Sequence, residues 1–523
     1  MFHSMEKYMY KFIFFILLLC WSGVSFANPS FQMRAVTGKP RTLIVFFDGL
    51  RPDYITPRYM PNLYRLRNEG CLGKEHHSVY PTMTRVNASS YSTGAYPAEH
   101  GIMSNEVYFP DIDRAHSLNT AGAEALDRIS SARQGQLLTA KSLGEMLESA
   151  GERMMVFSDG SQGQAYLQNH AISGGAIVNT EFIRPAAFRS VVENAIGQPP
   201  PFEELNRPRH KWITDALLTF GLVKDGPLVN AIWYADPDET AHAEGVGAPL
   251  TLQALSTIDN ELGRILQAIE ERQLTDSINI IISTDHGFIT RSGTEWPQDF
   301  LIRQNLKKDK DSDDVVLADG AIYVKGHDRK KIEQIVAALQ AQPWVGGIFT
   351  KALKPGSTHG WVKGTLSFAS IHWDHPDRAA DILVADYWDD AKNEQGYAGT
   401  SYYGGKPASH GGFSRYEVHI ALIAKGPSFK KAQQSDIPTS NADIAPTILN
   451  IYDIPVPQSM SGRVMYEFLN NTHATMLPAV QKEKIITSAP YNGGVYNLTL
   501  QRTIVGKYIY LDFAKVVRTK TGK

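Results

Sequence analysis

Short apolar runs alternate along the chain with longer segments of helical periodicity. The run at residues 41–47 (RTLIVFF) is continuous and rich in β-branched and aromatic side chains, as expected of a strand buried on both faces. Similar runs predict strands at residues 154–157, 228–234, 278–283 and 418–424. Apolar residues at helical spacing predict helices at residues 60–68, 137–149, 250–271 and 442–452. This alternation predicts an α/β fold with a mostly parallel sheet, in which ligands bind beyond the carboxyl ends of the strands.

Two regions depart from the alternation. Residues 320–352 have the pattern of a strand, a helix and a second strand, and they interrupt the main series. We therefore predict an inserted cap subdomain at residues 288–403, within a discontinuous catalytic domain formed by residues 28–287 and 404–481. In the last region, residues 482–523, two segments alternate apolar and polar positions (VYNLTLQ and KYIYLDF), which predicts a terminal β-hairpin.

The N-terminal segment has the layout of a signal peptide. Lys7 and Lys11 precede an apolar run at residues 12–21, and the small residues Ser25 and Ala27 suit a cleavage site. The run is short for a membrane span, so we expect removal of residues 1–27 and export to a periplasm or out of the cell, with no stable membrane span remaining. An uncleaved anchor is the alternative. Cys71 is then the only cysteine left, so no intrachain disulfide is expected.

The charge balance excludes one class of partner. The chain has 52 Lys and Arg residues against 54 Asp and Glu residues, which gives a formal net charge of -2. Such a protein has no overall basic field, so we expect no nucleic-acid groove. Any anion must be bound by local groups.

Carboxylate and imidazole side chains accompany several of the predicted strands. Three strands are followed by an aspartate, in two cases with a histidine nearby, and another histidine lies in a glycine-rich turn before the last strand. These residues are Asp48, Asp238, His242, Asp285, His286 and His410. Each one alone is more typical of a helix cap or a turn. Together they form the ligand set of zinc, so their joint occurrence at strand ends predicts a metal site.

Residues 80–102 are rich in hydroxyl side chains and begin a predicted helix after Pro81. A Ser or Thr at the start of a helix and beside a metal ion can be ionised by coordination, and it then acts as a nucleophile without a histidine base. The helix N-terminus also favours an anion beside it. Most of the other hydroxyl groups are expected to cap or pack the helix.

Six groups of residues occur in a characteristic order between residues 42 and 463: FDGLRPDYI with MPNLYRLRNEG, PTMTRVNASSYSTGAYPAEHGI, PDETAH, STDHGF, SHGGFS and DIAPTILNIYDIPVP. They resemble the motifs of the nucleotide pyrophosphatase/phosphodiesterases within the alkaline phosphatase superfamily. The resemblance implies an alkaline-phosphatase-like three-layer sandwich with a mostly parallel central sheet. It also implies two Zn²⁺ ions, one held by Asp238, His242 and His410 and the other by Asp48, Asp285 and His286.

The same resemblance implies the reaction. Thr84, and not Thr82, would be the nucleophile and would contact the second metal ion, while Asn105 would bind a phosphoryl oxygen. The implied activity is that of an exported two-zinc hydrolase, which cleaves phosphodiester or pyrophosphate bonds through a covalent phospho-threonine intermediate. Its substrate would be a small phosphate ester, with a nucleotide and a lipid head group as the options.

The sequence departs from the family pattern where the substrate is chosen. Arg85 and Val86 follow Thr84, although the family often has an aromatic residue and then proline there. Arg85 is therefore a candidate to pair with a second phosphate or an acidic head group, the alternative being a packing role. The segment at residues 157–163 lacks the Lys-x-Arg pair of related monoesterases, which favours diesters. Tyr166 and Trp233 are further candidates for substrate contact.

Two alternatives remain open at this point. One is a phosphomonoesterase or phosphonate hydrolase on the same two-metal site. The other is a non-catalytic binding protein of the cell envelope with a vestigial site.

Overall fold

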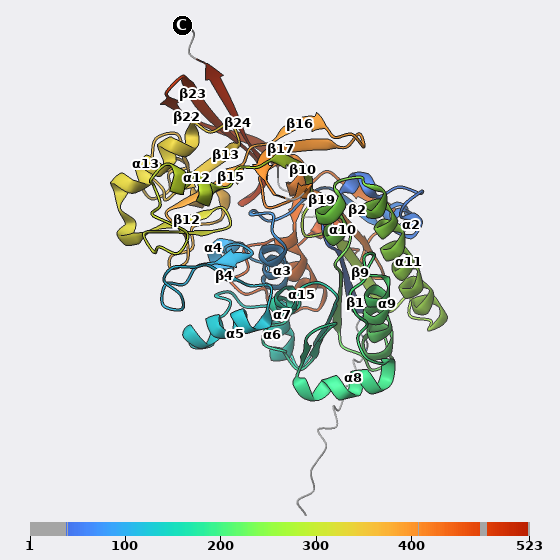
Figure 1. Ribbon diagram of the computed structural model, residues 1–523. Coiled ribbons are helices and arrows are strands. Elements are labelled where there is room, and N and C mark those ends of the chain that lie inside the picture. Colours follow the sequence, from blue (N-terminus) through green and yellow to red (C-terminus); the bar gives the residue numbers. More distant parts are fainter. Residues whose placement is uncertain (1–37, 39, 406, 471–478, 521–523) are drawn as a thin grey trace, which may run out of the picture. The chain divides into compact units, whose positions relative to one another are not determined.

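The computed structural model describes residues 38, 40–405, 407–470 and 479–520, so the predicted signal peptide lies outside the described residues. The main sheet within this part of the chain has ten strands (Figure 1). Their order is β20 (Gln433–Ser435), β2 (Cys71–His77), β19 (His419–Lys425), β9 (Ile278–Ser283), β1 (Arg41–Phe47), β8 (Val229–Tyr234), β5 (Met154–Ser158), β6 (Ala176–Asn179) and β7 (Ile183–Arg184), while β21 (Thr439–Ser440) also pairs with β2. The strands from β9 to β6 pair in parallel, whereas β19 is antiparallel to both neighbours. The prediction of a mostly parallel sheet is confirmed.

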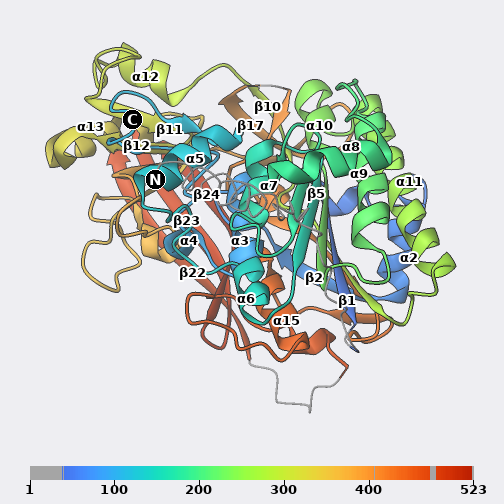
Figure 2. The same ribbon diagram turned by 90° about the horizontal axis from the view of Figure 1, so that it is seen from below.

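Helices cover both faces of this sheet because side chains on successive strand residues point to opposite sides. In β1, Ile44 and Phe46 join one core, and Leu43, Val45 and Phe47 join the other; all five are fully buried. The first core contains α3 (Thr84–Thr93), α5 (Ala123–Ala132), α6 (Leu143–Ser149), α7 (Gln162–Gln168) and α15 (Ile444–Ile451). The second contains α2 (Pro61–Glu69), α8 (Arg189–Ile196), α9 (Arg207–Ala216) and α11 (Pro249–Glu271). The result is the predicted three-layer sandwich, seen edge-on in Figure 2.

One predicted helix is shorter than expected. The pattern predicts a helix over residues 137–149, but α6 begins only at Leu143. Ser142 and Glu145 form a capping box, in which Ser142 Oγ accepts the Glu145 N–H at 3.2 Å and the Glu145 carboxylate accepts the Ser142 N–H at 2.9 Å. These bonds satisfy N–H groups of the first turn and set the start of the helix there. None of the described helices is both long enough and apolar enough to cross a bilayer.

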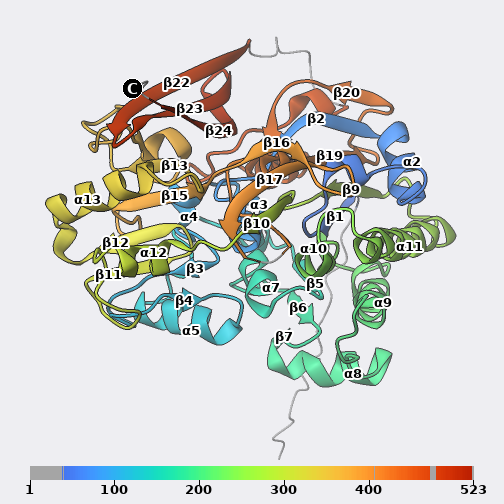
Figure 3. The ribbon, with the colours of Figure 1, turned by 45° about the horizontal axis from the view of Figure 1, so that its top comes forward.

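The inserted region, with the strand that follows it at residues 408–409, forms two smaller sheets (Figures 1 and 3). The first has the order β11 (Val315–Ala318), β12 (Ala321–Val324), β15 (Ile382–Asp386), β13 (Val345–Thr350) and β14 (Leu366–Ser367), and it packs with α12 (Pro297–Arg303) and α13 (Arg329–Gln340). The second has the order β16 (Asp389–Lys392), β17 (Ala398–Gly404), β10 (Ile289–Gly293) and β18 (Ala408–Ser409). The expected strand, helix and strand are β12, α13 and β13. The domain boundaries stay a prediction.

The C-terminal region has three strands rather than the two of the predicted hairpin. They are β22 (Val480–Tyr491), β23 (Gly494–Val505) and β24 (Tyr508–Lys520), of which β23 and β24 are the expected pair. Most of β22 is exposed, so its sequence carries no clear apolar alternation. The sheet packs on the inserted region: Tyr496 Oη donates to Gly346 O at 2.9 Å, and Trp388 Nε1 donates to Ala514 O at 2.7 Å.

Candidate functional site

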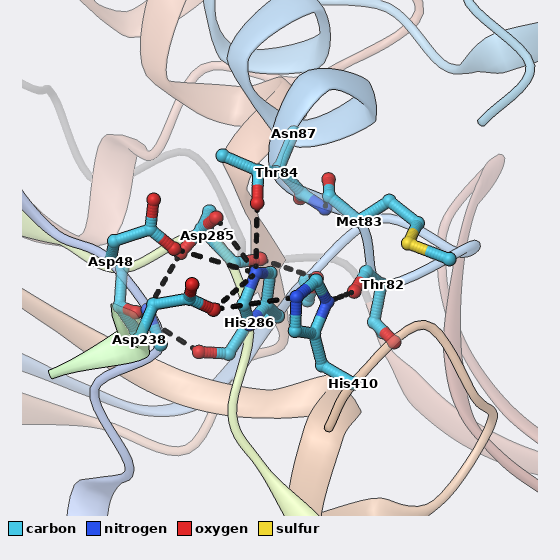
Figure 4. A network of polar contacts seen from close by, with 12 residues as sticks. Asp48, Thr82, Met83, Thr84, Asn87, Asp238, Asp285, His286 and His410 are labelled. Carbon is cyan, nitrogen blue, oxygen red and sulfur yellow. Dashed lines mark hydrogen bonds and ion pairs between the residues drawn. The ribbon is translucent and has the colours of Figure 1, made fainter. Parts of the chain in front are cut away.

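The predicted metal ligands meet beyond the carboxyl ends of three adjacent strands (Figure 4). Because β1 pairs in parallel with β8 on one side and with β9 on the other, residues that follow these strands are brought together. The set comprises Asp48 after β1, Asp238 and His242 on α10 (Asp238–Glu244) after β8, Asp285 and His286 after β9, and His410 after β18. Sequence positions far apart therefore converge on one site, which we call the carboxylate–imidazole cluster.

Two groups of three ligand atoms within the cluster are compact enough for a metal ion, since the atoms of each group lie within 4.8 Å of one another. In the first group, Asp238 Oδ1 lies 3.5 Å from His242 Nε2 and 3.3 Å from His410 Nε2. In the second, His286 Nε2 lies 3.5 Å from Asp48 Oδ1 and 3.9 Å from Asp238 Oδ1. Asp238 is thus common to both groups.

Asp285 lies beside the second group of ligand atoms. The resemblance puts Asp285 in the second group, where the compact set contains Asp238 instead. Asp285 is nevertheless fully buried beside it, with Oδ2 3.0 Å from His286 Nε2. Its Oδ1 accepts the Gly49 N–H at 3.0 Å, which fixes the carboxylate and directs Oδ2 towards the cluster.

Each histidine of the cluster turns its Nδ1 atom towards a main-chain carbonyl. The pairs are His242 with Ala408 O at 3.1 Å, His286 with Gly287 O at 3.1 Å, and His410 with Thr82 O at 2.8 Å. A carbonyl can only accept, so the proton resides on Nδ1 and the lone pair on Nε2. This is the tautomer in which Nε2 binds a metal ion.

Three carboxylate oxygens of the cluster have no hydrogen-bond partner among the described residues. They are Asp48 Oδ1, Asp238 Oδ1 and Asp285 Oδ2. Burial raises the pKa of Asp48 well above its ordinary value, and repulsion from Asp285 and Asp238 raises it further. Unpaired carboxylates in such surroundings are costly unless positive charge compensates them. The donor set and the orphaned oxygens therefore fit divalent cations.

Trp233 is buried next to one ligand of the cluster. Its ring is fully buried and stacks on Phe46, with centroids 4.5 Å apart. Its Nε1 donates to Asp48 Oδ2 at 2.9 Å, which leaves Oδ1 directed at His286. The structure thus gives Trp233 a hydrogen bond to a predicted metal ligand, and its contact with substrate stays a prediction.

The two threonines near the start of α3 have different surroundings. Thr84 is the first residue of α3, and its Oγ1 lies 3.2 Å from His286 Nε2 (Figure 4). Thr82 Oγ1 instead donates to Gly412 O at 2.8 Å and accepts the Gly411 N–H at 3.0 Å. Thr82 therefore holds the loop of His410, and Thr84 is the hydroxyl residue that faces the cluster.

A cavity of about 600 Å³ opens beside the cluster. Its walls come from the cluster side and from the inserted region; they include Asn105, His242, His410, Trp296, Lys310 and Tyr403. Asn105 Oδ1 accepts the Arg85 N–H at 3.0 Å. Its Nδ2 has no acceptor among the described residues, so it is available to donate to an anion in the cavity.

Comparison with known proteins identifies the family. The sequence profile of type I phosphodiesterase / nucleotide pyrophosphatase matches residues 42–397. The chain belongs to this family. Mouse ectonucleotide pyrophosphatase/phosphodiesterase family member 3 is 26% identical over 273 residues, which cover 51% of this chain and 27% of the mouse protein. Human family member 5 is 22% identical over 446 residues, which cover 84% of this chain and 80% of the human protein.

The chain also resembles venom phosphodiesterase 2 of the rattlesnake Crotalus adamanteus, with 27% identity over 249 residues, 47% of this chain and 26% of the venom protein. It thus spans about a quarter of the length of the mouse and rattlesnake relatives. Among solved structures, wild-type alkaline phosphatase PafA has a TM-score of 0.63 at 15% identity and covers 83% of this chain and 99% of PafA. Murine ectonucleotide pyrophosphatase/phosphodiesterase 5 has a TM-score of 0.57 at 19% identity, with 80% and 96% covered. The alkaline-phosphatase-like fold is confirmed.

Tyr166 of this type I phosphodiesterase family member lies apart from the cavity. Its hydroxyl donates to Asp127 Oδ1 at 3.0 Å and accepts from Arg184 Nη1 at 3.2 Å, and its ring packs against Phe182. The structure gives it a packing role in the first core, and no contact with the cluster.

Sequence reasoning missed a buried network beneath α10. His210, on α9, lies between two carboxylates: Nδ1 contacts Asp159 Oδ2, and Nε2 lies 3.0 Å from Asp236 Oδ2. All three side chains are fully buried, apart from a trace of exposure at Asp159. Asp159 Oδ1 also accepts the Ala235 N–H at 2.8 Å, so the network is hydrogen-bonded to the segment that leads from β8 to Asp238. No motif or spacing marks His210, because its partners are distant in sequence.

Proposed function

We propose that this protein is an exported hydrolase that cleaves phosphodiester or pyrophosphate bonds through Thr84 on a site for two zinc ions. The observation that carries the proposal is the position of Thr84 Oγ1 at the N-terminus of α3, 3.2 Å from His286 Nε2 and next to three aspartates (Figure 4). Membership of the type I phosphodiesterase / nucleotide pyrophosphatase family supports this class of reaction.

Asp238, His242 and His410 would hold one zinc ion, and Asp48, Asp285 and His286 the other; Asp238 belongs to both compact groups of ligand atoms. When bound, zinc would lower the pKa of a coordinated hydroxyl group and balance the negative charge of a phosphate. The three Nδ1 contacts to carbonyl groups hold the imidazole rings in orientation, so little reorganisation is needed when an ion enters.

The reaction itself is assigned to residues of the chain. Thr84 Oγ1 attacks the phosphorus in line with the leaving group, the bond to the leaving oxygen breaks, and the leaving group departs with a proton. Water then hydrolyses the phospho-threonine, which releases the phosphate and restores the hydroxyl. Asn105 Nδ2 donates to a nonbridging oxygen, since Arg85 N–H holds its Oδ1. The N-terminus of α3 adds partial positive charge beside the same oxygens.

Two relatives support the role of a threonine and the class of substrate. An inactive threonine-to-alanine variant of murine ectonucleotide pyrophosphatase/phosphodiesterase 5 has been solved in complex with AMP. The rattlesnake relative is a venom phosphodiesterase. For this chain we propose a small phosphate ester as the substrate, with a nucleotide or a lipid head group attached. The relatives named ectonucleotide and venom enzymes also support export, to a periplasm or out of the cell.

The nucleophile is tested by comparing Thr84→Ala and Thr84→Ser with Thr82→Ser, a control two residues earlier in the chain whose hydroxyl is retained. Metal content and hydrolysis of bis-para-nitrophenyl phosphate are measured on each. We expect about two zinc ions in every protein, loss of activity by about a thousandfold or more in Thr84→Ala, and substantial activity in the two serine variants. Full activity of Thr84→Ala would exclude Thr84 as nucleophile. Absence of both zinc and turnover in the wild type would favour the non-catalytic envelope protein.

Export is tested separately by expression of the whole chain in a bacterium, cell fractionation and sequencing of the N-terminus. Cleavage after Ala27 is expected, so that the mature protein starts at Asn28. An intact N-terminus in the membrane fraction would support the uncleaved anchor.

A further inference from the structure

Arg85 is a buried cation with unused hydrogen-bonding capacity. It follows Thr84 in α3, and only 8% of its surface is exposed. Its Nε donates to Thr120 Oγ1 at 3.0 Å, but its Nη atoms reach neutral oxygens only at 3.4–3.5 Å: Asn119 Oδ1, Asn105 O and Ser161 Oγ. No carboxylate among the described residues forms an ion pair with it. A guanidinium in this position is incompletely satisfied.

Another buried arginine shows how the Nη donors of a guanidinium can be paired within this fold. Arg378 also lacks a carboxylate partner in the described part of the chain, but its Nη atoms donate to the carbonyl oxygens of Gly101, Leu137 and Gln136 at 2.9–3.0 Å. Main-chain carbonyls at short range compensate a buried guanidinium. The Nη groups of Arg85 have no carbonyl oxygen of the described residues at this short range. Their hydrogen-bonding capacity is therefore available to an anion.

The electric field around Arg85 supports the same conclusion. Burial lowers its pKa, while the carboxylates of Asp319, Asp48, Glu106 and Asp238 attract the charge from a distance. Two of these carboxylates belong to the cluster, where bound cations would cancel their charge. The attraction of Asp319 and Glu106, which lie outside the cluster, would remain, but the total negative field at Arg85 would be weaker. The planar fork of the guanidinium, next to Thr84 in the chain, suits two oxygens of a phosphate.

We infer that Arg85 binds a second anionic oxygen of the substrate, so that the site favours a doubly charged phosphoryl group or a pyrophosphate over a singly charged diester. The inference rests on the proposed function and shifts its substrate preference from simple diesters to pyrophosphates and to the dianionic esters of the phosphomonoesterase alternative. The segment at residues 157–163 brings no cation of its own, which by itself favours diesters. In the structure, however, Arg85 Nη1 lies 3.5 Å from Ser161 Oγ in that segment. The segment therefore has a cation beside it, which comes from α3.

The test compares wild type with Arg85→Gln, which removes the charge, and Arg85→Lys, which keeps the charge without the fork. Each is assayed on para-nitrophenyl phosphate, on ADP and on bis-para-nitrophenyl phosphate, which separate a dianionic ester, a pyrophosphate and a monoanionic diester. Arg184→Gln is the control, since Arg184 pairs with Asp127 away from the cavity. Binding of phenyl phosphate and diphenyl phosphate to Thr84→Ala, with and without Arg85→Gln, is measured by calorimetry.

In Arg85→Gln we expect kcat/KM to fall about thirtyfold or more on the monoester or on ADP and less than about threefold on the diester. A loss on the monoester alone places the second oxygen on the reacting phosphoryl group; a loss on ADP alone places it on the neighbouring phosphate. The kcat/KM of Arg85→Lys should lie between those of wild type and Arg85→Gln. Phenyl phosphate should bind more weakly without Arg85, whereas the binding of diphenyl phosphate should not change.

Equal losses of kcat/KM on all three substrates, or no loss, would overturn the inference and leave the proposed function intact. Absence of turnover by the wild type on every substrate would overturn the proposed function itself. Unchanged metal content and melting temperature show that the variants fold.

Discussion

The buried network around His210 predicts a pH dependence of stability that a single substitution should remove. His210 contacts Asp159 on one side and Asp236 on the other. Burial lowers its pKa, but the two carboxylates outweigh this effect and raise the pKa from 6.5 to about 10. At 1.36 kcal/mol per pKa unit, this difference corresponds to about 5 kcal/mol of stabilisation from the charged imidazole. The side chain is fully buried, so solvent screening does not reduce this value.

The direction of the effect follows from linkage. A pKa that is higher in the folded protein than in the unfolded chain stabilises the fold fully below pH 6.5, and this stabilisation disappears as the pH rises towards about 10. His210→Gln cannot carry the charge and leaves two buried carboxylates facing each other. We expect it to lower the free energy of unfolding by about 3–5 kcal/mol at pH 6, and by about 1 kcal/mol at pH 10.

Urea unfolding at pH 6, 8 and 10, with chelator-treated wild type and variant, measures this difference. His100→Gln is the matched control. His100 is also fully buried, but its hydrogen-bond partners are the neutral Ser90 Oγ and Ile102 N–H. Burial, together with the nearby His375 and Arg378, lowers its pKa well below the ordinary value, so it stays neutral. Its cost should therefore be the same at all three pH values. If His210→Gln lowers the free energy of unfolding by the same amount at pH 6 and at pH 10, the imidazole of His210 is not charged in the folded protein.

Two further predictions concern hydrogen bonds that support other parts of the molecule. Trp233→Phe keeps the stacked ring but removes the donor to Asp48 Oδ2; we expect metal affinity to fall by about tenfold or more, measured by competition with a chelator, and an unchanged affinity would show that Asp48 needs no such support. Tyr510→Phe removes a hydroxyl that donates to Asp443 Oδ2 at 2.9 Å and accepts from Arg463 Nε at 2.8 Å. We expect it to lower the free energy of unfolding by about 1–3 kcal/mol in a denaturant titration, while a value near zero would mean that water replaces the hydroxyl.

Much of the sheet was predictable because burial leaves a direct mark on composition. The run at residues 41–47 lies between two helical layers, so every position in it is buried and the last five are apolar. Residues that follow such strands share one edge of a parallel sheet, which is why Asp48, Asp238 and Asp285 could be expected together. The structure adds one feature that the spacing of these residues in the sequence does not show: Asp238 belongs to both groups of ligand atoms.

Other features were not predictable because their partners are distant in sequence. Trp233 has the pattern of any core aromatic residue, and only the register of β1 with β8 brings its indole N–H to Asp48. Strand β2 is missed because exposed Lys74 and Glu75 interrupt its apolar run. The exposed β22 is missed for a similar reason. It is held as a strand by main-chain pairing with β23, and most of its side chains are exposed and show no apolar alternation.

The sheet formed by β22, β23 and β24 affects the order in which the protein can mature during synthesis. Val384 and Tyr403, which line the cavity, share a core with Leu498 and Leu500 of β23. The last predicted metal ligand in the chain is His410, so every ligand leaves the ribosome before the strands that complete this wall. A nascent chain thus contains all the predicted ligands before it has the strands that pack against this wall, and the finished cavity depends on a segment made after all of them.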